Sequence, residues 1–198
     1  DIDLVDTYHL NMFLSSYEFS FSVYDPNDKR CVRLESYIFP ELHIPGKNDD
    51  MVLEIFENNH VLPAAFWGTI NVFISNRTYA FVPSELFSER TAKEILKFDC
   101  DWNPDTENFL SHKISNYHVI SGHSKEIETF FDKIYPNRKV NFNSALINLI
   151  PRPKFNPNKA TEVVAFLDEK LLTVIVYKNN SFISVSYTHL RAHAVSYT

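Results

Sequence analysis

The order of the predicted strands constrains this fold most, because a run of three strands occurs near both ends of the chain. Alternating apolar and polar residues predict strands over 10–16 and 18–24, and a third strand over 31–39 follows a turn. Residues 161–185 repeat the same three-stranded opening. Such a repeat suggests a duplicated fold with two related subdomains.

Helical and strand patterns alternate between these two runs, which predicts an α/β class with an α+β-like order of elements. Residues 67–75 and 78–83 are predicted to form two strands around a tight turn. Residues 140–150 fit either a strand that enters a helix or a single short helix. The other predicted elements are helices over 50–62, 84–98 and 124–135, and a hairpin of strands 108–115 and 117–122.

A proline-rich segment divides the chain. Pro151, Pro153 and Pro157 fall within seven residues, so 151–159 is predicted to be a linker. We therefore expect a first subdomain over 1–150 and a second subdomain that starts at residue 160. The linker is basic and could recruit a partner, but a stiff hinge is the simpler role.

Glycine is scarce, and this limits the kinds of nucleotide site. The chain has 3 glycines, where average usage would give roughly fourteen. Phosphate-cradling loops need glycine, because backbone amides must approach the anion closely. The sequence contains neither GxGxxG nor GxxxxGK[ST], so a glycine-loop nucleotide site is disfavoured.

Charge and cysteine content limit the partners and the compartment. The net charge is -6, with acidic and basic residues interspersed, which argues against nucleic acid and an anionic membrane as the main partner. The chain has no run of eighteen apolar residues, so no membrane-spanning helix is predicted. The two isolated cysteines, Cys31 and Cys100, fit a reducing cytoplasm better than a disulfide framework.

Three histidines lie close together within 111–124, a predicted hairpin. His112, His118 and His123 could meet across the strand pair, and imidazole is a common metal ligand. No cysteine or carboxylate lies beside them at ligand spacing. We therefore predict no metal site and expect exposed or edge-strand histidines.

Two acidic groups resemble known sites but have simpler explanations. Glu85 and Glu89 lie four residues apart on the predicted helix 84–98, where capping after Ser84 and the helix dipole account for them. The second group comprises Asp99, Asp101 and Asp105. It lacks the glycine and the final glutamate of a calcium loop, which predicts a solvated loop.

The segment Ser121–Ser124 places hydroxyl groups beside a histidine. It does not match the G-x-S-x-G nucleophile elbow, so hydrolase chemistry is not favoured. Ser124 is instead predicted to cap the helix over 124–135. Trp67 and Trp102 could anchor a partner, but burial is the ordinary outcome for a tryptophan.

Several short stretches together resemble a bacterial family, the domain of unknown function numbered 3822. The resemblance extends from Leu4 to about Ser184, and VPSELF at Val82–Phe87 is its most specific element. None of the stretches is catalytic. They are LVDTYHLNMFLSS, NVFISNRTYAFVPSELFSE, LKFD, YHVIS and FFDKIYPN.

The resemblance implies an actin-like ATPase fold, of ribonuclease-H-like type, with two subdomains that each begin with a three-stranded meander. In that superfamily the first turn of each half carries an Asp-x-Gly phosphate loop. Here Leu14–Glu18 has neither residue, and Leu167–Lys170 has Asp168 but no glycine. Asp168 is thus the only candidate cofactor-binding residue, and ATP with magnesium is expected only if a full-length second subdomain supplies the loops.

The last residues resemble the translation of a transposon adapter used to prepare DNA sequencing libraries. VSYT occurs at Val185 and again at Val195. We therefore expect the native chain to end near Ser184, so that the second subdomain stops after its three strands and 185–198 is a non-native tail. His189 and His193 have the spacing of a helical zinc pair, but in such a tail they would have no function.

The leading hypothesis is a non-catalytic, cytoplasmic protein with a divergent actin-like fold, which acts through contacts with an unknown protein partner. The alternative is an ATP-binding or ATP-hydrolysing enzyme of the actin-like superfamily whose nucleotide loops lie outside this sequence. A third hypothesis is a metal-dependent hydrolase that uses the hairpin histidines. The apolar strand edges that a truncated second subdomain would expose also predict self-association of the chain.

Overall fold

The structure is a computed structural model that describes residues 7–39, 47–64, 67–75, 78–100, 102–114, 116–149, 161–168, 171–178 and 181–189. Contacts within the chain divide it into two compact units, residues 1–147 and 148–198.

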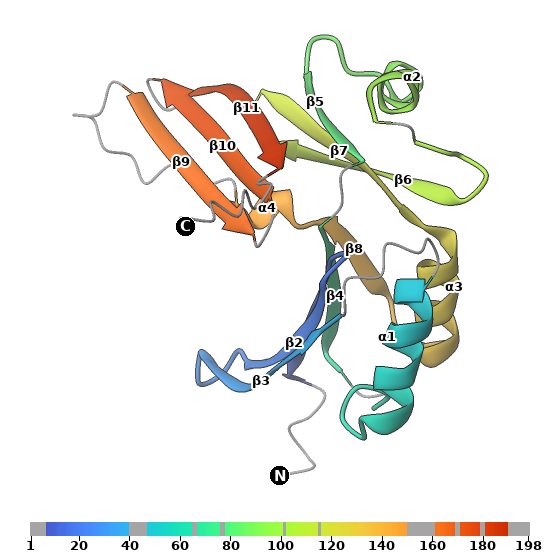
Figure 1. The fold of residues 1–198 in the computed structure, drawn as a ribbon. Coiled ribbons are helices and arrows are strands. Elements are labelled where there is room, and N and C mark those ends of the chain that lie inside the picture. Colours follow the sequence, from blue (N-terminus) through green and yellow to red (C-terminus); the bar gives the residue numbers. More distant parts are fainter. Residues whose placement is uncertain are drawn as a thin grey trace, which may run out of the picture. The chain divides into compact units, whose positions relative to one another are not determined.

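A mixed five-stranded sheet in the order β3-β2-β1-β4-β8 forms the centre of the first unit (Figure 1). The first three strands form an antiparallel meander, as their alternating sequence predicts. The last two strands join in parallel, β4 beside β1 and β8 beside β4. The bounds are β1 His9–Leu14, β2 Glu18–Asp25, β3 Arg30–Ile38, β4 Thr69–Ile74 and β8 Val140–Ser144.

The main hydrophobic core lies between one face of this sheet and two helices, α1 (Lys47–Asn58) and α3 (Lys125–Ile134), which lie together in Figure 1. Every second residue of β1, β2 and β4 is buried, because side chains alternate across a strand. The helices contribute Phe56, Ile127 and Phe131 to the core. Burial of Ile127 and Phe131 confirms the predicted apolar face of α3.

The other face of the central sheet carries a row of three asparagines. Asn11 of β1 is paired with Asn71 of β4, and Asn71 is paired with Asn141 of β8. The Nδ2 atom of Asn71 donates to Oδ1 of Asn11 at 2.8 Å, and Nδ2 of Asn141 lies 3.3 Å from Oδ1 of Asn71. The row therefore runs across three strands at one register position.

A second, smaller sheet in the first unit has the order β5-β7-β6 and is antiparallel. The helix α2 (Glu89–Asp99) packs on it through Ala92 and Leu96, which lie in one core cluster with Ile120 and Trp102. The strands are β5 Tyr79–Pro83, β6 Glu107–Ile114 and β7 Tyr117–Ser124.

Two predictions about these elements were wrong. The strands over 67–75 and 78–83 do not pair with each other, because β4 lies in the central sheet and β5 in the smaller one. The helix predicted from residue 84 begins at Glu89, because Ser88 is its N-cap and accepts the Thr91 amide at 3.1 Å. Pro83–Leu86 instead forms a turn, which is closed by a hydrogen bond from the Leu86 amide to the Pro83 carbonyl.

The helix predicted over 50–62 is shifted to Lys47–Asn58. It ends early because Asn59 begins a turn, in which its Oδ1 accepts the amides of Val61 and Leu62. The two alternatives for 140–150 are resolved in favour of a strand followed by the short helix α4 (Leu146–Leu149). Among the described residues, no helix is long and apolar enough to cross a membrane.

The second unit contains an antiparallel meander in the order β11-β10-β9, which confirms the predicted strand-strand-strand pattern. The strands are β9 Thr161–Asp168, β10 Leu171–Lys178 and β11 Ser181–His189. The third strand thus continues past the predicted end of the native chain at Ser184. The predicted linker 151–159 and the rest of the tail, with His193, lie outside the described residues.

Candidate functional site

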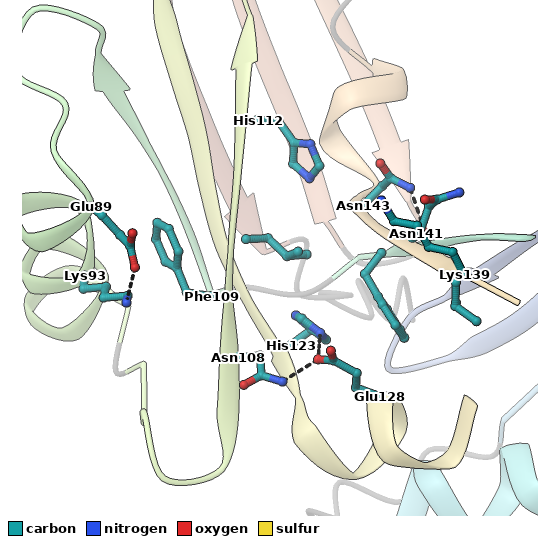
Figure 2. Close-up of a pocket in the computed structure, with 13 residues that line it drawn as sticks. Glu89, Lys93, Asn108, Phe109, His112, His123, Glu128, Lys139, Asn141 and Asn143 are labelled. Atoms are coloured by element: carbon teal, nitrogen blue, oxygen red, sulfur yellow. Dashed lines mark hydrogen bonds and ion pairs between the residues drawn. The ribbon is translucent and has the colours of Figure 1, made fainter. Parts of the chain in front are cut away.

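A groove of about 650 Å³ in the first unit is the best candidate site (Figure 2). Its two long sides are β6 and β8, and each is an edge strand of its own sheet. The helices α2 and α3, together with His123 of β7 and Lys139 before β8, complete the lining. The lining residues are Glu89, Lys93, Asn108, Phe109, Leu110, His112, His123, Glu128, Lys139, Val140, Asn141, Phe142 and Asn143.

Glu128 and His123 form a polar network at one end of the groove (Figure 2). The Nε2 atom of His123 lies 2.9 Å from Oε2 of Glu128, and the amide of Asn108 donates to the same oxygen. The imidazole also stacks on the ring of Phe142, with centroids 4.9 Å apart. One carboxylate therefore joins β6, β7 and α3, while the histidine contacts β8.

The local sequence explains how Glu128 reaches this position. Ser124 is the N-cap of α3, and its Oγ accepts the amides of Glu126 and Ile127 at 3.1 and 3.3 Å. This cap starts the helix directly after β7, so Glu128 lies one turn into the helix and beside the strand that carries His123. The capping role predicted for Ser124 is confirmed.

Burial favours the neutral form of both histidines that line the groove. Burial lowers the pKa of His123 below its ordinary value, and the hydrogen bond to Glu128 opposes this effect without cancelling it. Burial also lowers the pKa of His112. Because Nε2 of His123 faces a carboxylate, it carries the proton and Nδ1 is left as an acceptor.

Two buried nitrogens beside the groove have no hydrogen-bond partner in the described part of the chain. They are Nδ1 of His123 and Nε2 of His112. A buried polar atom without a partner costs free energy, about 1–3 kcal/mol in mutational data. A bound molecule that presented hydrogen-bond donors could recover part of this cost.

The two sides of the groove differ in character. On the α2 side, Lys93 pairs with Glu89 and lies 5.5 Å from the ring centroid of Phe109, so its charge is largely compensated. On the β8 side, Asn143 donates from Nδ2 to the Asn141 carbonyl at 2.9 Å. This second side therefore offers neutral amide groups together with the charge of the exposed Lys139.

The three hairpin histidines divide between two faces of the small sheet. His112 and His123 occupy one face and both line the groove. His118 lies on the other face, where it stacks on Phe87 at 3.6 Å and its Nδ1 lies 3.2 Å from the Ser111 hydroxyl. The expectation of exposed or edge-strand histidines is wrong for His123, which is 3% exposed on the central strand.

The predicted acidic pairs are not brought together. Glu85 precedes α2, and only Glu89 lies in its first turn. Asp99 ends α2, whereas Asp105 lies in a loop where its amide donates to Oδ1 of Asn103. Asp101 lies outside the described residues. Within the described ranges, no three histidine, cysteine or acidic residues are grouped as metal ligands.

The serine-histidine segment is packed rather than assembled as a nucleophile. Ser121 is buried, and no hydrogen bond of its hydroxyl group is found among the described residues. The groove lining includes no serine, threonine or cysteine in the described part of the chain. Trp67 and Trp102 are both buried, as expected.

The β1–β2 turn, where the resemblance predicts the first phosphate loop, is closed on itself. The amides of Tyr17 and Glu18 donate to the Ser15 hydroxyl oxygen at 3.2 and 3.0 Å. The Ser15 amide donates to the Glu18 carbonyl at 2.8 Å. Three amides that could face a phosphate are therefore already engaged.

The other nucleotide candidate, Asp168, is the last residue of β9, and its backbone is paired with Leu171. Its side chain and the two residues that follow it lie outside the description. A phosphate-binding role for Asp168 stays a prediction.

Comparison with known proteins identifies a matching family and similar solved structures. A family model described as "Protein of unknown function (DUF3822)" matches residues 1–186, which confirms the resemblance seen in the sequence. A search of curated proteins finds no match.

Three solved structures share the fold. A Bacteroides thetaiotaomicron protein with actin-like ATPase fold and unknown function has a TM-score of 0.79 and 19% identity, over 96% of this chain and 73% of that one. The cytoplasmic domain of EpsL, an inner membrane component of the Vibrio cholerae type II secretion system, scores 0.50 at 12% identity, over 92% and 70%. The PilM–PilN type IV pilus biogenesis complex scores 0.51 at 11% identity, over 92% and 61%.

Proposed function

We propose, from the premise that this chain belongs to the DUF3822 family and has a mixed α/β actin-like ATPase fold, that it is a non-catalytic protein that acts through protein–protein contacts. The observation that carries the proposal is the groove between two edge strands, β6 and β8. The occupant is an extended segment of a partner protein. The free thiols of Cys31 and Cys100 favour a cytoplasmic location.

Edge strands bind extended peptides because they present unpaired backbone amides and carbonyls. Here two such edges line one groove, and the side-chain carbonyl oxygens of Asn108, Asn141 and Asn143 add acceptors. The five residues of β8 set the length of pairing, roughly 17 Å at about 3.3 Å per residue. Main-chain hydrogen bonds would supply affinity, and the unpartnered Nδ1 atom of His123 would favour a donor side chain.

Two further observations support binding without nucleotide chemistry. The Ser15 hydroxyl occupies the turn amides that a phosphate would use. The similar proteins include an inner membrane component of a secretion system and a member of a pilus biogenesis complex. An assembly role for an actin-like fold is therefore our preferred proposal for this chain.

Site-specific photo-crosslinking tests the groove. Lys139 is exposed and lines the groove, whereas the equally charged Lys133 is exposed on α3 outside the lining. A photo-reactive phenylalanine at position 139, expressed in the organism that encodes the chain, should capture one protein through one extended segment, and the same group at 133 should not. Equal capture from both positions, or none from 139, would contradict the proposal.

The ATP-binding alternative is tested by thermal shift with magnesium and ATP. A ligand at a hundred times its Kd stabilises a protein by about 2.7 kcal/mol. We expect no saturable rise in Tm for the purified chain. A saturable rise that is lost in Asp168→Asn would establish the nucleotide site and overturn the non-catalytic proposal.

A further inference from the structure

The strand β3 is a long and open edge at the other end of the central sheet. In the described part of the chain it pairs as a strand only with β2. Its nine residues are mostly exposed, and they carry three of the large exposed apolar side chains, Val32, Leu34 and Ile38. Natural proteins usually protect such an edge, because it templates pairing with another chain.

The two faces of β3 have different chemistry. Leu34, which is 69% exposed, lies opposite Ser22 of β2 and away from the helical core. Arg33 and Glu35 lie on the opposite face, the helix-covered one, where their partners in β2 are Val23 and Phe21. An added strand would therefore meet an apolar centre on one face and a pair of opposite charges on the other.

We propose that β3 pairs antiparallel with β3 of a second copy of this chain, about a two-fold axis at Leu34. Leu34 is the middle residue of Arg30–Ile38, so this register centres the pairing on the strand. It places Leu34 opposite Leu34. It also places Arg33 opposite Glu35 of the second copy, and Glu35 opposite Arg33, as an isologous contact requires.

Charge selects this register over its neighbours. Within one chain, Nε of Arg33 donates to Oε1 of Glu35 at 2.6 Å, so the dimer would join two such pairs into a cluster of alternating sign. A slip by two residues in one direction places Arg33 opposite Arg33. A slip in the other direction places Glu35 opposite Glu35, and like charges directly opposite destabilise a strand pair.

The irregular part of β3 lies beside this centre. The register with β2 shifts between Val23 and Tyr24, which leaves Val32 as the extra residue. The three central pairs involve only Arg33, Leu34 and Glu35, so they avoid the bulge. The bulge bends the ends of the strand, which limits pairing to the central residues and disfavours growth by further strands.

The first test measures self-association of the full chain by sedimentation at several concentrations. We expect a reversible dimer whose Kd rises at least tenfold in Leu34→Lys. The matched control is Leu86→Lys, because Leu86 is 67% exposed but lies outside β3, and it should leave the Kd unchanged. A monomer at all concentrations, or an equal effect of both variants, would overturn the proposal.

The second test reads the register. Arg33→Glu should weaken the dimer, and adding Glu35→Arg should restore it, because the double exchange keeps opposite charges paired. Leu34→Cys should form a disulfide between two copies under mild oxidation, because directly opposite residues have Cα atoms about 4.5–5.5 Å apart. Leu86→Cys should not. A dimer of Leu34→Cys that persists without forming this disulfide would show that another surface holds the two copies together.

Discussion

The backbone of Gly122 lies directly against the indole of Trp102: a Cβ atom at position 122 would be 2.6 Å from Cδ1 of Trp102 and 3.1 Å from Cγ2 of Thr78. Real Cβ atoms do not approach another atom to 2.6 Å. Trp102 belongs to the core cluster beneath α2, so it has little room to move. Gly122 is therefore required by packing.

Gly122→Ala should destabilise the protein by about 1–3 kcal/mol, because a methyl group forces Trp102 out of its place. Urea unfolding measures the loss. In a double-mutant cycle, Trp102→Leu should relieve most of the effect, since the smaller side chain vacates the contact. Additive losses would show that the glycine acts through something other than the indole.

Stability should fall as the pH drops below about 6.5, the ordinary pKa of histidine. Burial lowers the folded-state pKa of His123, so the unfolded chain takes up a proton more readily than the folded one. The stabilisation is present above the unfolded-state pKa and is lost as the pH falls toward the lower folded-state value, with a slope of up to about 1.4 kcal/mol per pH unit. His123→Gln should flatten the profile measured by unfolding at each pH.

The second buried histidine of the groove should contribute to the same profile. His112→Gln should also reduce the slope, because burial lowers the pKa of His112 too. A profile that is flat in the wild type would exclude the account given for both buried histidines.

Tyr135→Phe should cost about 1–3 kcal/mol of stability, because the Tyr135 hydroxyl donates to the buried Leu62 carbonyl and its removal leaves that acceptor unpaired. Burial raises the pKa of Tyr135, so the hydroxyl keeps its proton over the ordinary pH range. Tyr24→Phe removes the hydroxyl of a half-buried residue of β2 and should change stability by less than about 0.5 kcal/mol.

Ser124→Ala should cost about 0.5–2 kcal/mol, because two amides at the start of α3 lose their acceptor. Ser124→Asp should retain most of the stability, since a carboxylate caps a helix and suits its dipole. Thermal unfolding of the two variants distinguishes capping from mere packing, for which aspartate would be the worse replacement.

Elements with a strong local signal were predictable from the sequence. The alternation in β1 and β2 and the apolar face of α3 reflect burial on one side, and this repeats with the period of the element. The pairing of β4 was not predictable in the same way. A short connection to β5 suggested a hairpin, but β4 has its partners in β1 and β8, far away in the chain.

The groove was only partly predictable. Two of its histidines could be singled out by residue type, but Glu128 looked like an ordinary helix residue. Its role depends on the Ser124 cap, which places the first turn of α3 against His123. Asn141 and Asn143 had no signal of their own. The sequence of a strand of five residues does not show which other strands lie beside it in the folded sheet.

The asparagine row gives the central sheet a means of choosing its alignment. Aliphatic side chains in β1 and β4 are nearly interchangeable, so a slip by two residues would still bury Met12 beside another apolar residue. The same slip would set Asn11 against Phe73 or Thr69 instead of Asn71 and break the amide contact. The three asparagines thus make contacts that only one register of the strands allows, while burial of the apolar core stabilises the sheet.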